Sequence, residues 1–184
     1  GVIGAGAMGT GIAQVAAAGF KQLSGGDFRT VIIIGGSHHE SFDGIALPTA
    51  TAFRTPLGDV PVDTSRAAQL TKLSPKIIYQ DSTHAAEHSI EVELPFLQTA
   101  LKDYKIVPIL FGQNSLELAH TLATALKEIV DDRTLIVVSS DLSHYPVAAD
   151  APAVDAQTIR AILTGDAEHL ETVTQGLMTA GTTN

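Results

Sequence analysis

The chain has 184 residues, of which 45% are hydrophobic, so it can bury the core of one globular domain. Its formal net charge is −9 and it has no run rich in lysine and arginine, which argues against nucleic acid and anionic membrane surfaces as partners. It contains no cysteine, which excludes disulfides, thiolate metal ligands and cysteine nucleophiles. Because no apolar run is long enough to cross a bilayer and no basic leader precedes the apolar opening, we expect a cytoplasmic protein of one domain.

The first twenty residues, GVIGAGAMGTGIAQVAAAGF, carry Gly4, Gly6 and Gly9 in the spacing G-x-G-x-x-G. Such glycines allow a tight turn and a close approach to a dinucleotide pyrophosphate. The string resembles the N-terminus of the 3-hydroxyacyl-CoA dehydrogenases, which implies NAD as a cofactor. However, the first strand would be limited to residues 1–3, and the next strand, 31–34, is not followed by an acid for the adenosine ribose. We therefore expect a helix here that packs on the sheet, with the glycines vestigial and without NAD binding.

Apolar runs that end in glycine or serine alternate with helical patterns along the rest of the chain. Such runs are typical of strands buried on both faces of a parallel sheet, and three are expected, over residues 30–36, 105–112 and 134–140. Helices are expected over residues 63–73 with Asp63 as N-cap, 115–130, 156–163 before Gly165, and 167–175 with Asp166 as N-cap. The segment 44–62 has three prolines and is expected to be an extended loop. This alternation predicts an α/β sandwich.

Histidines follow two of the predicted strands. His38 and His39 come after the first strand, and the sequence S-S-D-L-S-H brings Asp141 and His144 after the third. Open α/β sheets bind ligands at the carboxyl ends of their strands, so we expect these side chains to meet at one edge of the sheet. An aspartate three residues before a histidine can orient the imidazole and select its tautomer. The alternative is that these histidines only cap strand ends and bond to backbone carbonyls.

Five segments of the chain together form a recognisable pattern: VIIIGGSHHESFDGIALP (31–48), FRTPLGDVPVD (53–63), HAAEHSIEVELPFLQ (84–98), KIVPILFG (105–112) and IVVSSDLSHY (136–145). They resemble the Memo family, also called AmmeMemoRadiSam system protein B, in that family's order and spacing over about residues 21–175. The resemblance implies a three-layer α/β sandwich with a mainly parallel sheet, similar to the class III extradiol dioxygenases, and a site for divalent iron or copper. It also implies that His38 is a metal ligand, and that His144 is the acid/base or substrate-facing residue with Asp141 beside it. His39 is expected to support His38 or the local structure.

Two ligand positions of that family are missing here. Family members carry a Pro-His-Ala-Gly-Tyr segment well before the His-His pair, where this chain has residues 1–20, and a further ligand, often cysteine, after the last matched helix. A metal centre of this kind needs three protein ligands. We therefore expect iron or copper to bind weakly in a remnant pocket with little redox turnover. The foreign-looking leader suggests an incomplete or chimaeric Memo-like domain.

The stretch HAAEH, residues 84–88, also fits H-x-x-E-H, in which two histidines on one helix face bind zinc and the glutamate activates water. Because Pro95 limits that helix and the flanking residues match the Memo segment, a structural role for Glu87 and His88 near the pocket rim is preferred. His120 and His169 are expected at the surface.

Arg54 has two interpretations: it pairs with a carboxylate of the pocket, or it only pins its own loop. The leading function is a Memo-like protein whose remnant metal-dependent oxidoreductase pocket is formed by His38, Asp141 and His144. One alternative is a non-catalytic binding module on the same fold that takes a peptide or a small molecule. The other is an NAD-binding dehydrogenase fragment.

Overall fold

The computed structural model describes residues 17–140, 142 and 150–179, in two compact units, 1–140 and 141–184, that we treat separately. The elements of the first unit are β1 (Thr30–Gly36), β2 (Ile45–Leu47), β3 (Ala52–Thr55), β4 (Gly58–Pro61), α2 (Thr64–Leu73), β5 (Ile77–Tyr79), α3 (Asp81–Ala85), the 3₁₀-helix η1 (Glu91–Glu93), α4 (Leu94–Ala100), β6 (Lys105–Phe111), α5 (Leu116–Lys127) and β7 (Thr134–Val138). Gly4, Gly6 and Gly9 lie outside the described residues. The expectation of one domain stays a prediction.

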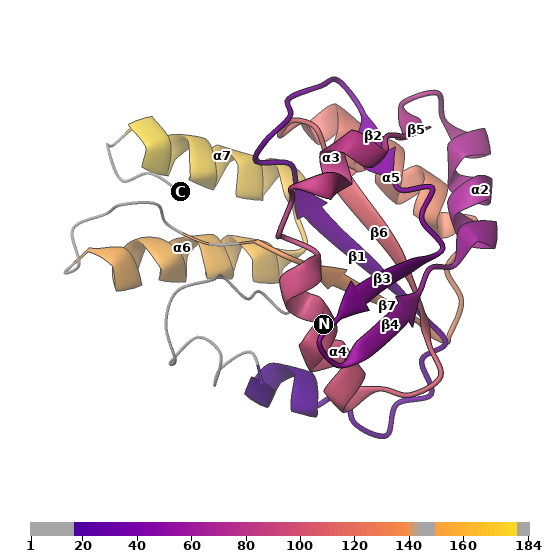
Figure 1. Cartoon of the computed structure of the whole chain (residues 1–184). Coiled ribbons are helices and arrows are strands. Elements are labelled where there is room, and N and C mark those ends of the chain that lie inside the picture. The colour runs from indigo at the N-terminus through magenta and orange to yellow at the C-terminus, as the bar shows by residue number, and fades with distance from the viewer. Residues whose placement is uncertain (1–16, 141, 143–149, 180–184) are drawn as a thin grey trace. The chain divides into compact units, whose positions relative to one another are not determined.

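A five-stranded sheet in the order β5-β2-β6-β1-β7 forms the centre of the first unit (Figure 1). The three long apolar runs of the sequence are its neighbouring strands β6, β1 and β7, all parallel, as predicted. Strand β2 is parallel to β5 but antiparallel to β6, so the sheet is mixed. The prediction of a mainly parallel α/β sheet is confirmed.

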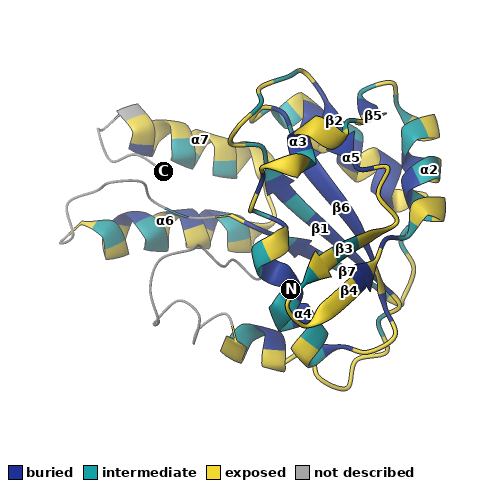
Figure 2. Ribbon diagram, in the orientation of Figure 1, coloured by how far each residue is buried: buried dark blue, intermediate teal, exposed yellow. Residues whose placement is uncertain are grey.

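Helices cover both faces of this sheet. Alternate side chains of each strand point to opposite faces, and the buried clusters follow that alternation. Ile32 and Val107 pack with α2 and α5 on one face, and Val31 and Ile106 pack with α4 and β4 on the other (Figure 1). Strands β1 and β6 are buried along most of their length, whereas the hairpin of β3 and β4 is largely exposed (Figure 2). Within the first unit these are the three expected layers.

Local capping explains where the two long helices begin. The carboxylate of Asp63 accepts a hydrogen bond from the Arg66 N–H at 3.1 Å, as predicted for an N-cap, and the Ser115 hydroxyl accepts from Leu118 N–H in the same way. The Arg66 guanidinium then donates to the carbonyl of Ile129 and to the carboxylate of Asp131, both at 2.6 Å. The start of α2 is thereby tied to the connection between α5 and β7.

The expectation of an extended loop over residues 44–62 is wrong, because this segment contains β2 and the hairpin of β3 and β4. Its prolines do not interrupt these strands. Pro48 follows β2, Pro56 lies between the hairpin strands and Pro61 is the last residue of β4, so no internal ladder loses an N–H donor. At the turn Gly58 has φ +117°, a conformation that favours glycine.

Arg54 lies in this hairpin, opposite Asp59. Its Nε and Nη2 donate to the two carboxylate oxygens of Asp59 at 2.8 and 3.0 Å, and both residues are exposed. The hydrogen bond from Arg54 holds the pKa of Asp59 below its ordinary value. Of the two interpretations of Arg54, the structure supports the one in which it pins its own segment.

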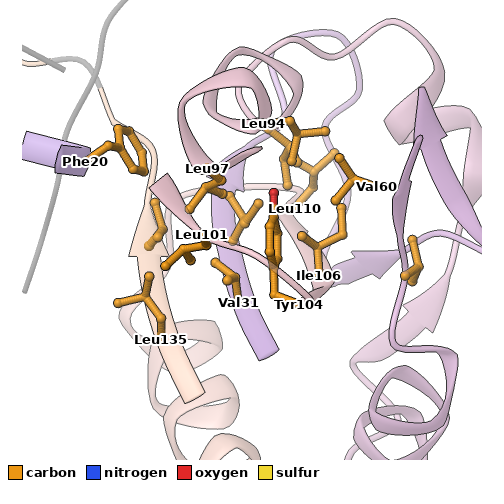
Figure 3. Close-up of a cluster of buried hydrophobic side chains, with 14 of the residues drawn as sticks. Phe20, Val31, Val60, Leu94, Leu97, Leu101, Tyr104, Ile106, Leu110 and Leu135 are labelled. Carbon is orange, nitrogen blue, oxygen red and sulfur yellow. The ribbon is translucent and has the colours of Figure 1, made fainter. Parts of the chain in front are cut away.

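The ends of helix α4 and of the first described helix meet in the core. From the sequence, Pro95 is expected to limit the helix before it. In the structure it stands in the first turn of α4, where a missing N–H costs no helical hydrogen bond, so it begins this helix. Residues 17–21 are helical, and the ring of Phe20 stacks on Phe96 with centroids 5.5 Å apart. Phe20 lies at the border of the cluster that also holds Leu97 and Leu101 (Figure 3).

The described part of the second unit consists of α6 (Ala151–Thr164) and α7 (Ala167–Thr179), which pack against each other. Gly165, with φ +71°, ends α6, and the Asp166 carboxylate caps α7 by accepting from His169 N–H at 2.9 Å, both as predicted. Helix α6 begins five residues earlier than expected, with Pro152 in its first turn. In the described ranges no helix combines the length and apolarity needed to span a bilayer.

Candidate functional site

The loop that follows β1 carries His38 and His39 beyond the carboxyl end of this strand. Ser37 N–H donates to the carbonyl of Phe111 on β6 at 2.9 Å, which holds the start of the loop. Further along, one carboxylate oxygen of Glu40 accepts hydrogen bonds at 2.9–3.1 Å from Gln80, Ser82 and Thr83 at the start of α3. The loop is therefore fixed on both sides of the two histidines.

His38 is held by Glu87, a residue 49 positions later in the chain. Its backbone N–H donates to Glu87 Oε2 at 2.7 Å and its ring Nδ1 lies 3.0 Å from Glu87 Oε1. Oε1 also accepts from the N–H groups of His88 and Ser89, each at 2.9 Å. The Glu87 side chain is 3% exposed and that of His38 is 63% exposed, so a buried carboxylate positions an accessible imidazole.

The protonation state of Glu87 follows from these contacts. Burial alone raises the pKa of Glu87, but the hydrogen bonds from the N–H groups of His38 and Ser89 and from the His38 ring outweigh it and lower the pKa from 4.5 to about 2. Since the ionised carboxylate can only accept, Nδ1 of His38 is the protonated nitrogen and donates to it. In the neutral imidazole Nε2 then carries the lone pair, which is the arrangement typical of a metal-binding histidine.

The described residues offer one ligand position and not a complete metal centre. His38 Nε2 has the right support, but no group of three His, Asp or Glu side chains able to hold a metal ion occurs in the parts of the chain that the structure describes. A three-ligand iron or copper site therefore does not fit these residues alone. His39 is exposed, and its side chain makes no hydrogen bond to another described residue, so its expected supporting role stays a prediction. The support that the structure shows for His38 comes from Glu87.

The other two predicted site residues, Asp141 and His144, lie outside the described residues. Strand β7, which they follow in the sequence, is the parallel neighbour of β1, with Val138 opposite Ile34 and Ser139 N–H donating to Ile34 O at 2.7 Å. The carboxyl ends of the two strands thus lie side by side, as expected. The meeting of His38 with His144 stays a prediction.

The zinc interpretation of HAAEH does not hold, because helix α3 ends at Ala85 and does not reach His88. His84 is largely buried and its Nε2 lies 3.3 Å from the carbonyl of Ala46, and burial lowers its pKa. His88 is exposed and its Nδ1 lies 2.6 Å from Glu91. The two imidazoles therefore have separate structural partners, which agrees with the structural role preferred from the sequence.

A second glutamate, Glu93, lies near the end of β7 and was not identified as a candidate from the sequence. The Glu93 side chain is fully buried, and neither carboxyl oxygen has a partner at hydrogen-bonding geometry among the described residues. Burial raises its pKa to about 7, and the hydroxyl of Ser139 at the end of β7 offsets this only in part. The available signal was the spacing Ile90, Glu93, Leu97, which puts this glutamate on an apolar helical face.

Gly35 gives the segment after α3 its place against β1. A Cβ at Gly35 would lie 2.6 Å from Ser89 Oγ, a hydroxyl that donates to Gly36 O at 3.1 Å. We expect Gly35→Ala to push Ser89 away, loosen the cradle of Glu87 and lower the free energy of unfolding by about 1–3 kcal/mol. Chemical denaturation measures this change.

The matched control is Gly36→Ala, because a Cβ at Gly36 meets nothing within 4 Å and its φ is not in the left-handed region. This variant should be within about 0.5 kcal/mol of the wild type or slightly more stable. If Gly35→Ala is as stable as Gly36→Ala, then Ser89 yields freely and Gly35 has no special role.

Comparison with known proteins agrees with this structure. The chain matches the family model described as Memo-like protein over residues 5–181. It is 34% identical over 156 residues to a MEMO1 family protein of Nitrosopumilus maritimus, covering 84% of this chain and 57% of the relative. It is 36% identical over 157 residues to a MEMO1 family protein of Archaeoglobus fulgidus (80% and 57%) and 39% identical over 135 residues to one of Thermotoga petrophila (71% and 48%).

The chain spans about half the length of the curated relatives it matches. The family model nevertheless covers nearly all of its residues, including the loop with His38 and the segment with Glu87 and Glu93. The resemblance inferred from the five sequence segments is therefore confirmed, and this chain belongs to the Memo-like protein family.

Proposed function

We propose that this Memo-like protein has a remnant metal-dependent oxidoreductase pocket at the carboxyl ends of β1 and β7. The observation that carries the proposal is the bond between His38 Nδ1 and the buried carboxylate of Glu87, at 3.0 Å. It fixes the ring and leaves Nε2 as the nitrogen that can bind divalent iron or copper. Asp141 and His144, which follow the neighbouring strand in the sequence, would supply the acid/base pair.

The affinity of this pocket for a metal ion should be weak, because the described residues contribute one imidazole where a redox centre needs three ligands. What His38 and Glu87 do by themselves is limited to orienting one ligand and selecting the tautomer of the neutral ring in which Nε2 carries the lone pair. We therefore expect metal binding that is measurable and redox turnover that is low or absent.

Thermal unfolding with Fe(II), Cu(II) or Zn(II) tests this proposal. At a metal concentration about tenfold above the dissociation constant, the wild type should gain about 1.4 kcal/mol of stability, and His38→Ala should gain nothing. The matched control is His88→Ala, which removes an imidazole that is 72% exposed but keeps the backbone N–H that donates to Glu87. This control should respond to metal as the wild type does.

A shift that persists in His38→Ala, or no shift with any of the three metals, would refute the metal site and leave the fold unaffected. The second candidate is then a non-catalytic binding module, which is favoured because no group of three metal-binding side chains is found among the described residues. In that case inorganic phosphate, as a small-anion probe, should bind equally to the wild type and to His38→Ala, without oxygen consumption.

A further inference from the structure

Residues 87–93 form a short segment that places a carboxyl group at the ends of two neighbouring strands. At its first residue Glu87 holds His38 behind β1, and at its last residue Glu93 is buried near Ser139 at the end of β7. Between them the Ser89 hydroxyl donates to Gly36 O. The segment is internally tied, since Val92 N–H donates to His88 O at 3.3 Å and Glu93 N–H to Ile90 O at 3.2 Å. These hydrogen bonds connect the part of the segment next to Glu87 with the part that carries Glu93.

The buried position of Glu93 favours its neutral acid form over the carboxylate. Its side chain is fully buried beside Leu94, with both oxygens lacking a hydrogen-bond partner among the described residues. Among the described residues an ionised carboxylate there would have no counter-ion, which makes it much more costly than a neutral carboxylic acid. Loss of the proton therefore favours any movement that brings Glu93 to water.

The described groups around Glu93 do not compensate for that charge. Among them the polar side chain that acts on Glu93 is Ser139, which is neutral. Tyr104, in the core cluster with Leu94, is a phenol whose pKa burial raises to about 12 (Figure 3). Glu91 is exposed and paired with His88, and Glu87 is fully engaged by its own donors. In the described part of the chain no basic side chain is among the groups that act on Glu93.

We propose that residues 87–93 are a proton-dependent clasp, in which neutral Glu93 anchors the segment in the core and thereby keeps Glu87 on His38. Ionisation of Glu93 releases the anchor, frees the three N–H groups that donate to Glu87 and leaves His38 without its support. As a regulation of the His38 site this inference rests on the proposed function, but the clasp itself involves no metal ion.

The direction of the pH effect follows from the two states of Glu93. In the closed clasp its pKa is raised to about 7, and in the open one it returns toward 4.5. The closed state is thus fully favoured below about pH 4.5 and loses its advantage as the pH rises to about 7, where both states are ionised. Between pH 5 and pH 7 the opening equilibrium should increase about thirtyfold and then level off.

Backbone hydrogen exchange followed by NMR on the metal-free protein tests the clasp. The amides of His38, His88 and Ser89, which donate to Glu87, should exchange through a local opening. After correction for the intrinsic exchange rate, their opening should rise about thirtyfold from pH 5 to pH 7 in the wild type and stay constant in Glu93→Gln. The core amides of Val31 and Val107 report global unfolding in the same spectra and should open far less often.

Ser139→Ala is a second test variant, in which Glu93 itself is kept. It removes the hydroxyl that lowers the pKa of Glu93, so the pH at which opening levels off should move upward. The clasp is refuted if the three amides exchange only at the rate of Val31 and Val107, or if their opening is independent of pH in the wild type. Since no metal is present, failure here leaves the metal titration standing, and failure of metal binding leaves the exchange result standing.

Discussion

Replacing Glu87 with alanine should lower the free energy of unfolding by about 3 kcal/mol near neutral pH. The carboxylate accepts four hydrogen bonds, three of them from the backbone N–H groups of His38, His88 and Ser89 and one from the His38 ring. Alanine leaves these donors without a partner in a largely enclosed site. Chemical denaturation of the wild type and the variant at pH 7 measures the loss.

The same carboxylate should shape the acid limb of the stability curve. Its folded-state pKa of about 2 is below the ordinary value of 4.5, so its contribution is complete above about pH 4.5 and is lost as the pH falls toward 2. The shift corresponds to about 3 kcal/mol. Glu87→Ala should therefore differ most from the wild type above pH 4.5 and converge with it in acid.

Glu91→Ala is the matched control for Glu87, since Glu91 lies four positions later and its side chain is 56% exposed. It removes a surface pair with His88, and its effect should stay within about 0.5 kcal/mol at every pH. If Glu87→Ala is as stable as this control, the N–H donors are served by water and Glu87 does not hold the segment together.

Replacing Glu93 with glutamine should have the opposite effect and stabilise the protein at high pH. Glutamine has nearly the same shape and cannot ionise, so the variant avoids the burial of an unpaired charge. At pH 8 it should be more stable than the wild type by up to about 3 kcal/mol, and at pH 4 the two should be nearly equal. Thermal or denaturant unfolding at the two pH values gives the comparison.

The sign is set by the raised pKa of Glu93, about 7 against an ordinary 4.5. Such a group contributes full stability below pH 4.5 and loses it as the pH rises through 7. Glu91→Gln, an exposed neighbour, should leave the pH profile unchanged. A wild-type profile that is flat between pH 4.5 and 8 would show that Glu93 reaches water or a partner.

Much of the fold could be predicted because its strongest signals are local. Strands β1, β6 and β7 are continuous apolar runs, and α2 begins at Asp63, where the short carboxylate can cap. The three-residue strands were missed, because β2 and β5 are too short to show a period, and in β5 both Ile78 and Tyr79 are exposed. The hairpin of β3 and β4 was not predicted, because the prolines of this segment indicated a loop, whereas they lie at strand ends and in the turn.

For the candidate site too, one part could be predicted from the sequence and another depended on the tertiary structure. The sequence alone determined the family, the α/β class and the place of His38 after a buried strand, because these depend on residue order and local periodicity. Only the tertiary structure decided that Glu87 supports this histidine and that Glu93 is buried with its proton. Both depend on how deeply a carboxyl lies and which donors reach it, and packing between segments 40 to 50 residues apart sets that environment.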